Sequence, residues 1–176
     1  VVLCTTTGAN DRALATLPPE HTFDLVVIDE AAQALEASCW IALLRGKRTV
    51  LAGDHLQLPP VVKSSSADEG GLSVTLMERL LQQQPDVGWM LTPQYRMHAD
   101  ICRWASDELY DGRLTPDASV ESHTLSSLPG VAVSEATSAA LVFIDTAGCD
   151  CEEDSEEASA GAMGAGARRS MLIALS

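Results

Sequence analysis

The sequence has few basic residues and few aromatic ones. Lysine and arginine total 11 against 25 aspartates and glutamates, a formal net charge of −14 over 176 residues, and aromatics make up 4%. Proteins that coat nucleic acid neutralise phosphates with a surplus of Lys and Arg, so that class is excluded and any nucleic-acid contact must be local. No apolar run approaches the roughly 18 residues of a membrane helix. The sequence also lacks the basic start of a signal peptide, so we expect neither feature.

The five cysteines lack the spacing of a disulfide framework. Their odd number is typical of a reducing compartment, which predicts an intracellular protein of the nucleus or the cytoplasm. The one close pair, Cys149 and Cys151, has no second pair and no histidine at the spacing of a zinc site. We therefore expect two free thiols in a loop rather than a metal centre.

Three short apolar runs predict neighbouring strands of a parallel sheet. They are Val1–Cys4, Phe23–Ile28 and Thr49–Ala52, and each ends in polar residues. Their apolarity is continuous rather than alternating, which is typical of strands buried on both faces. Residues 31–45 carry small and apolar side chains at helical spacing, and Gly46 is expected to end that helix. Strand, helix and strand in this order form a βαβ unit, so the predicted fold class is α/β.

Further elements are predicted downstream. Helices are expected over 72–83, with Leu72, Leu76 and Leu80 in the core, and over 99–109, with Ile101, Trp104 and Ala105 buried. Short apolar runs predict strands at Trp89–Leu91 and, buried, at Leu141–Ile144.

The remaining segments predict little regular structure. Residues 57–71 and most of 110–140 are broken by Gly, Pro and Ser. From about residue 148 the chain is first acidic and then almost entirely Ala, Gly and Ser, a composition that cannot build a core. We expect residues 148–176 to be disordered.

Polar side chains follow each of the first three predicted strands. Thr6 and Thr7 come after the first, Asp29 and Glu30 after the second, and Asp54 after the third. Open α/β sheets bind ligands at the carboxyl ends of their strands, so this edge is the predicted binding site. The alternative is that polar residues simply close the strands and open the loops.

Asp29 and Glu30 directly behind a buried strand form a Walker-B arrangement. The first carboxylate of such a pair holds Mg²⁺ beside nucleotide phosphates. The second is placed to orient and deprotonate a water molecule. The alternative is that both acids cap the following helix and favour its positive end.

Two further segments carry polar groups suited to phosphate. Gln57 follows Gly53 and Asp54, and its amide can donate to a phosphate oxygen while Pro59 and Pro60 stiffen the loop; alternatively this is a proline-capped surface loop. In the second segment, Tyr95 and Arg96 suit a stacked base and a phosphate contact. An ordinary strand-to-helix connection with an interfacial arginine is the alternative there. His98 is expected to start a helix, and His21, His55 and His123 to lie at the surface.

These segments in this order resemble superfamily 1B helicases of the nonsense-mediated-decay helicase group. The resemblance is carried by Asp29-Glu30-Ala31-Ala32-Gln33, Gly53-Asp54-x-x-Gln57-Leu58-Pro59-Pro60 and Gln94-Tyr95-Arg96-Met97-His98, and it covers about residues 1 to 150. It implies two RecA-like domains, P-loop NTPase folds with a parallel sheet and flanking helices, with ATP bound between them. Residues 1–93 would be the later part of the first domain, 94–147 the start of the second, and 148–176 a tail.

The resemblance also implies a role for each motif residue. Asp29 would hold Mg²⁺ and Glu30 would be the general base. Gln57 would sense the γ-phosphate with support from Asp54, Tyr95 would stack on adenine, and Arg96 would be an arginine finger. Thr5, Thr7 and Gly8 would touch the nucleic-acid backbone. The implied activity is ATP-driven 5′-to-3′ unwinding of DNA or RNA.

Two parts of the family pattern are missing from these 176 residues: the phosphate-binding loop, and the later motifs that complete the second domain, including a further Arg. The phosphate-binding loop, Gly-x-x-x-x-Gly-Lys-Ser/Thr, does not occur, and without it the β- and γ-phosphates have no cradle. We therefore expect an internal piece of a helicase with little ATPase activity by itself, its partner being the missing remainder of the chain. The alternative is a non-catalytic RecA-like module that binds nucleic acid or protein. An unrelated P-loop ATPase is disfavoured because it would not predict Gln-Tyr-Arg-Met-His.

Overall fold

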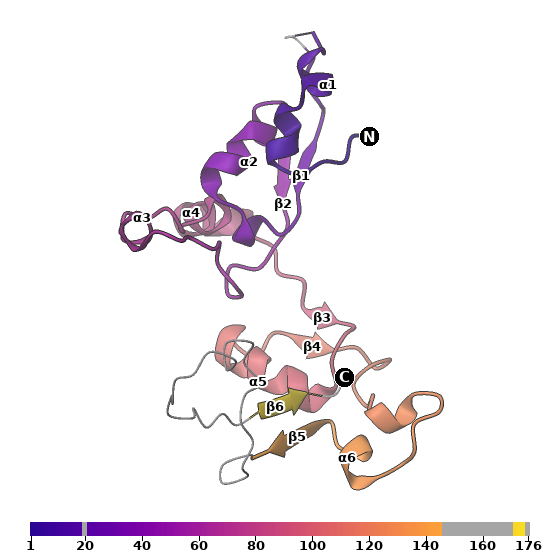
Figure 1. Cartoon of the computed structure of the whole chain (residues 1–176). Helices are drawn as coiled ribbons and strands as arrows, with labels where there is room; N and C mark the ends of the chain where they lie inside the picture. Colours follow the sequence, from indigo (N-terminus) through magenta and orange to yellow (C-terminus); the bar gives the residue numbers. More distant parts are fainter. Residues whose placement is uncertain (19–20, 146–170, 175–176) are drawn as a thin grey trace, which may run out of the picture. The chain divides into compact units, whose positions relative to one another are not determined.

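The computed structural model describes residues 1–18 and 21–145, and the backbone of residues 171–174. The chain divides into two compact units, Val1–Trp89 and Met90–Ser176, and each unit is described by itself (Figure 1). Within the described residues, no helix has both the length and the apolarity to span a membrane.

The first unit is built on two parallel strands joined through a helix. β1 (Val26–Ile28) pairs with β2 (Thr49–Leu51) in the register that places Ile28 opposite Leu51. The predicted strand–helix–strand unit is confirmed, but the predicted helix over 31–45 is split into η2 (Ala31–Gln33) and α2 (Glu36–Leu43). The split lies at Ala34 and Leu35, whose ψ angles of 132° and 138° are not helical. The Ala31 amide, at the start of η2, donates to the Ala52 carbonyl and ties η2 to the end of β2.

A small core holds this unit together. Ile28, Ala31, Cys39 and Leu76 are buried against one another, with Leu80 and other partly buried residues packed around them. Leu76 opens α4 (Leu76–Gln83), and the hydroxyl of Thr75 caps that helix by accepting from the Glu78 amide at 3.1 Å. The cap begins the helix four residues later than predicted, and Leu72 is therefore an exposed residue outside it.

Several predictions for this unit are wrong. Val1–Cys4 is not a strand, because it pairs with no described strand; the chain instead forms η1 (Thr7–Asn10) and α1 (Arg12–Ala15). The strands are not buried on both faces, since Val27 and Val50 are 59% and 50% exposed. Successive side chains of a strand point to opposite faces, and the core forms on the Ile28 side alone. The predicted 57–71 loop contains a short helix, α3 (Ser65–Glu69), and η3 (Pro85–Val87) follows α4.

The second unit begins with another parallel pair. β3 (Pro93–Gln94) pairs with β4 (Thr115–Pro116), and α5 (Ala99–Leu109) connects them. The predicted helix over 99–109 is confirmed, whereas the predicted strand at Trp89–Leu91 is wrong because pairing starts only at Pro93. The buried residues of α5 are Cys102 and Ser106, and the predicted core residue Trp104 is 68% exposed.

The rest of the second unit is largely irregular, as predicted. It contains η4 (Leu125–Ser127), α6 (Glu135–Ser138) and β5 (Leu141–Ile144), which pairs antiparallel with β6 (Met171–Ala174). The position of β5 is confirmed, but its predicted burial is wrong because Phe143 is 62% exposed. Disorder is not found at Met171–Ala174; the other tail residues, with Cys149 and Cys151, lie outside the described residues.

Candidate functional site

The carboxyl ends of β1 and β2 are joined to each other. The Ala52 amide donates to the Ile28 carbonyl, and the Ala31 amide donates to the Ala52 carbonyl, each at 2.8 Å. These bonds bring together the two segments that carry the predicted carboxylates, Asp29 with Glu30 and Asp54. The part of the predicted edge that follows the second and third predicted strands is therefore joined by backbone hydrogen bonds.

Gly53 allows the two segments to approach closely. Its φ is +155°, and a Cβ placed on it would lie 2.9 Å from the Ala31 amide nitrogen and 3.1 Å from that of Ala32. Both neighbours are backbone atoms that cannot rotate away. A side chain at this position would push the Asp54 loop away from the Asp29–Glu30 segment.

Asp29 and Glu30 are exposed at this edge, and Glu30 has an unusual backbone conformation. Its φ of 52° and ψ of 38° are left-handed, which costs a non-glycine residue on the order of 1 kcal/mol. Asp111, outside the candidate site, has a similar φ of 53°. Asp29 Oδ1 accepts from the Glu30 amide at 3.0 Å, and Gln33 Nε2 donates to Glu30 Oε2 at 3.2 Å. Glu30 makes no side-chain capping bond to η2, so the capping alternative does not describe this carboxylate.

Asp54 and Gln57 form a compact turn. Asp54 Oδ1 accepts from the Leu56 amide at 3.0 Å, and Asp54 Oδ2 accepts from Gln57 Nε2 at 2.8 Å. The amide nitrogen of a glutamine has a second hydrogen, so Gln57 can still donate to another acceptor. The turn fixes the Gln57 amide beside the Asp54 carboxylate.

Thr5, Thr7 and Gly8 lie together at η1. Thr5 Oγ1 accepts from the Gly8 amide at 3.0 Å and lies 3.3 Å from the Thr7 hydroxyl oxygen. η1 packs against α2 rather than continuing a strand, so these residues do not extend the row of strand ends that the sequence predicted. Thr5 and Thr7 are both exposed.

In the second unit, the Gln94 side chain organises the segment that carries Tyr95 and Arg96. Gln94 Oε1 accepts from the Arg96 and Met97 amides, each at 2.7 Å, and Nε2 donates to the Met97 carbonyl at 2.8 Å. Tyr95 is 67% exposed. Arg96 is also exposed, and its guanidinium makes no hydrogen bond or ion pair with any residue that the structure describes. The motif includes Gln94 with Tyr95 and Arg96, but the sequence did not predict that Gln94 braces the segment.

His98 starts α5, as predicted. Its Nδ1 accepts from the Asp100 amide at 3.0 Å, which is the N-cap bond of this helix. His21, His55 and His123 are exposed, which confirms the surface placement expected for them.

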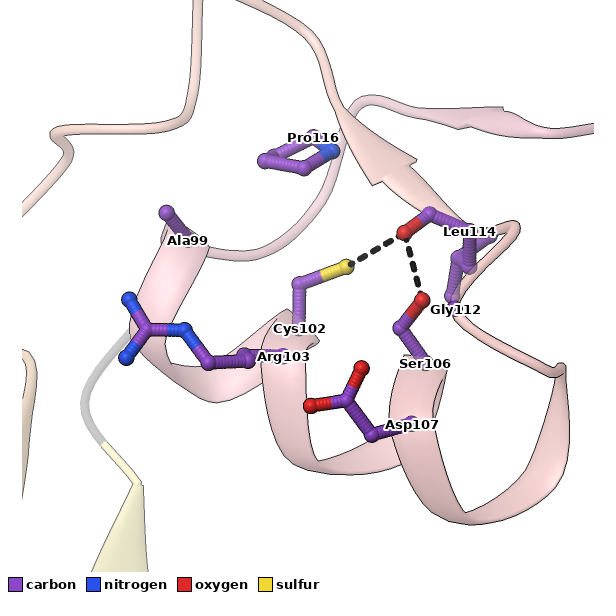
Figure 2. A pocket seen from close by; sticks show the side chains of 8 residues that line it. All are labelled: Ala99, Cys102, Arg103, Ser106, Asp107, Gly112, Leu114 and Pro116. Carbon is purple, nitrogen blue, oxygen red and sulfur yellow. Dashed lines mark hydrogen bonds between the residues drawn. The ribbon is translucent and has the colours of Figure 1, made fainter.

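A pocket of about 240 Å³ lies between α5 and β4 in the second unit, and no predicted site residue lines it (Figure 2). Its two buried polar side chains, Cys102 and Ser106, both donate to the Leu114 carbonyl, at 3.8 and 2.8 Å. The donor hydrogens of both side chains are thus used within the protein. These two buried side chains therefore have no free donor for a ligand in the pocket.

The acidic edge was tested for its fit to Mg²⁺. Within the described ranges, no three or more metal-ligating side chains gather as a metal cluster. Mg²⁺ at nucleotide sites is held by one or two carboxylates together with phosphate oxygens and water, not by a protein cage. A single exposed Asp29 next to Glu30 at the end of β1 fits that pattern.

Comparison with known proteins gave matches along most of the chain. A family model described as "AAA domain" matches residues 1–65, and a second model with the same description matches residues 72–167. The second match covers more than half of the chain.

Curated relatives agree with these models. The chain is 54% identical over 160 residues to "DNA-binding protein SMUBP-2" of Mesocricetus auratus, covering 90% of this chain and 16% of that protein. It is 42% identical over 158 residues to "DNA polymerase alpha-associated DNA helicase A" of Schizosaccharomyces pombe, covering 89% and 23%. It is also 42% identical over 117 residues to "ATP-dependent helicase upf1" of the same yeast, covering 65% and 12%. The chain thus spans less than a quarter of the length of each of these relatives.

Proposed function

Because the chain belongs to the AAA-domain family of superfamily 1 helicases, we propose that it is the part of an ATP-dependent helicase in which one RecA-like domain ends and the next begins. The family models imply a RecA-like P-loop fold, and the parallel β1–β2 pair with its flanking helices is an incomplete version of it. The single observation that carries the proposal is the edge where Asp29, Glu30, Asp54 and Gln57 are brought together by the bonds between β1 and β2.

At this edge the two neighbouring acids are assigned different tasks. Asp29 would hold Mg²⁺, which would neutralise charge on the phosphates of bound ATP. Glu30 is the general base that takes a proton from the attacking water. The left-handed backbone of Glu30 sets the direction of its side chain, and Gln33 donates a hydrogen bond to its carboxylate.

Two other groups act on the γ-phosphate. Gln57 donates to it from an amide that Asp54 keeps in place. Arg96, offered by the second domain, supplies the positive charge of an arginine finger. Tyr95, next to it in the chain and largely exposed, stacks on the adenine. We propose domain limits of 1–93 and 94–147 for these two parts, followed by a tail over 148–176.

The proposed substrate of the motor is DNA or RNA, moved in the 5′-to-3′ direction. Thr5, Thr7 and Gly8 at η1 contact the sugar-phosphate backbone. The exposed hydroxyls of Thr5 and Thr7 are common phosphate ligands, and the Gly8 amide holds the Thr5 hydroxyl in place. The chain is strongly acidic, so the nucleic acid must bind in a confined basic channel. We place the protein in the nucleus or the cytoplasm, because its described cysteines, Cys4, Cys39 and Cys102, are free thiols.

The proposal is tested on a full-length protein that carries this chain together with a phosphate-binding loop. We expect ATP hydrolysis that is stimulated by single strands, and unwinding of duplexes with a 5′ overhang but not of those with a 3′ overhang. Parallel DNA and RNA substrates identify which nucleic acid is used. Binding of nucleic acid with neither ATP binding nor hydrolysis would instead support the non-catalytic module.

A further inference from the structure

We infer that Gln94 is a positioning residue that fixes the direction of the Arg96 side chain, an inference that rests on the role proposed for Arg96. The Gln94 carboxamide uses both of its polar atoms on the next turn of the chain. Its oxygen accepts from the Arg96 and Met97 amides, each at 2.7 Å, and its nitrogen donates to the Met97 carbonyl at 2.8 Å. Through these three bonds, the Gln94 side chain holds the backbone of the loop over residues 95–97.

The supported loop is anchored at both ends. On one side, Gln94 lies in β3, opposite Pro116 of β4, and its carbonyl accepts from the Asp117 amide at 2.9 Å. On the other side, His98 caps α5 and the Ala99 amide donates to the Glu121 carbonyl at 3.0 Å. The loop backbone between these anchors is held by Gln94 at the Arg96 and Met97 amides and at the Met97 carbonyl.

These bonds fix the backbone of Arg96, from which its flexible side chain extends. Its guanidinium meets no partner in the described part of the chain, whereas its backbone amide is held by Gln94. An arginine side chain has many rotamers, and pre-setting its Cα–Cβ direction limits the volume that the charge samples. Contact with a developing charge depends on such placement, because a misplacement of 1 Å can lower a rate by about 10²-fold.

The chemistry requires glutamine at this position. A glutamate keeps the accepted bonds but has no hydrogen for the Met97 carbonyl, and a methionine of similar length has neither group. Gln94→Glu therefore retains two of the three bonds and Gln94→Met retains none. We expect the ATPase kcat to fall in the order wild type, Gln94→Glu, Gln94→Met.

The test is a double-mutant cycle on ATPase kcat and KM in the full-length protein, with Gln94→Met, Arg96→Ala and both together. We expect Gln94→Met to lower kcat by about 10²-fold. When Arg96 is already alanine, the same change should lower kcat by less than about twofold, the scatter between independent sites. Gln83→Met, at an exposed glutamine near the end of α4, is the matched control and should leave kcat unchanged.

Each result decides between named outcomes. An equal fall of kcat in both backgrounds would mean that Gln94 acts independently of Arg96, and it would overturn the inference. Wild-type kcat in Gln94→Met would do the same. Wild-type kcat in Arg96→Ala would refute the proposed arginine finger, and that failure is visible in this variant alone. If Gln94→Met does not fold, which thermal unfolding shows, the cycle is decided with Gln94→Glu.

Discussion

Gln57 donates a hydrogen bond of 2.8 Å from its Nε2 to Oδ2 of Asp54, the residue that follows the turn glycine after β2. The bond closes a turn in which the other carboxylate oxygen of Asp54 accepts from the Leu56 amide. The Asp54 carboxylate thus fixes the position of the Gln57 side-chain amide. If Gln57 contacts the γ-phosphate as proposed, Asp54 serves that contact by holding the Gln57 amide.

The first prediction concerns this pair. Asp54→Ala and Gln57→Ala should each lower ATPase kcat of the full-length protein by about 10²-fold, the effect of removing one preorganised donor. The double variant should be little worse than either single one, because Asp54 acts through Gln57. Steady-state kinetics of the four proteins measure this coupling. Losses that multiply in the double variant would show that Asp54 has a separate role.

The second prediction concerns Glu30. Glu30→Gln should bind ATP as the wild type does, because the residue assigned to Mg²⁺, Asp29, is untouched. Hydrolysis should fall by about 10²- to 10⁴-fold, since an amide cannot accept the proton of the attacking water. Equilibrium binding of a labelled nucleotide and single-turnover hydrolysis measure the two effects separately.

A matched variant separates this effect from a general loss of charge. Glu69→Gln removes one exposed carboxylate at the end of α3, outside the proposed site, and should hydrolyse ATP at the wild-type rate. Undiminished single-turnover hydrolysis in Glu30→Gln would remove Glu30 from the role of base.

The predicted strands that have a neighbouring strand to pair with are confirmed. Val26–Ile28 and Thr49–Leu51 are short β-branched runs separated by a helix, and they pair as expected. Val1–Cys4 is also a short apolar run, but it pairs with no described strand. A strand needs a neighbour because its backbone N–H and C=O groups require hydrogen-bond partners. The start of α4 was misplaced for a local reason, because the Thr75 cap outweighs the apolar Leu72.

The sequence predicted the residue types of the candidate site and the shared edge at the ends of β1 and β2, but not the local geometry of its loops. Acidic and amide groups after apolar runs indicated Asp29, Glu30, Asp54 and Gln57. The left-handed backbone of Glu30 and the bracing by Gln94 depend on bonds formed only when the loops close. Neither leaves a periodicity or a spacing in the sequence from which it could be derived.

The third prediction tests the close approach at Gly53. Gly53→Ala places a Cβ 2.9 Å from the Ala31 amide nitrogen, and such overpacking costs about 1–3 kcal/mol. The Ala31 and Ala52 amides should exchange hydrogen faster, because the bonds that join the ends of β1 and β2 are weakened. Hydrogen-exchange mass spectrometry of the peptides over 26–34 and 49–57 measures this. Gly71→Ala is the control, since its φ is also positive, at +88°, but nothing lies within 4 Å.

If the Ala31 and Ala52 amides exchange at the wild-type rate in Gly53→Ala, the loops after β1 and β2 accommodate the added Cβ without losing stability. In that case the shared edge is not enforced by Gly53. If Gly71→Ala and Gly53→Ala speed exchange equally, the effect comes from backbone conformation and not from the contact with Ala31.

The fourth prediction concerns the ion pair between α2 and α4. Arg79 donates to Glu36 from Nε at 2.9 Å and from a terminal nitrogen at 2.5 Å, and Trp40 Nε1 donates to the same carboxylate at 3.1 Å. The bond from Arg79, and next that from Trp40, hold the pKa of Glu36 below its ordinary value of 4.5. The two side chains of the pair are 36% and 28% exposed, so solvent screening keeps the contribution to stability modest.

The sign of the pH dependence follows from the lowered pKa of Glu36. The unfolded chain binds this proton more readily than the folded chain, so the stabilising contribution is fully present above pH 4.5 and is lost as the pH falls through the lower folded value. Glu36→Gln should therefore have a lower urea midpoint than the wild type at pH 7, and the difference should shrink on acidification to about pH 3. Glu69→Gln, with an exposed carboxylate on the same unit, should follow the wild type throughout. A midpoint difference between Glu36→Gln and wild type that stays constant from pH 7 to pH 3 would show that packing of the side chain, and not the charge pair with Arg79, links α2 to α4.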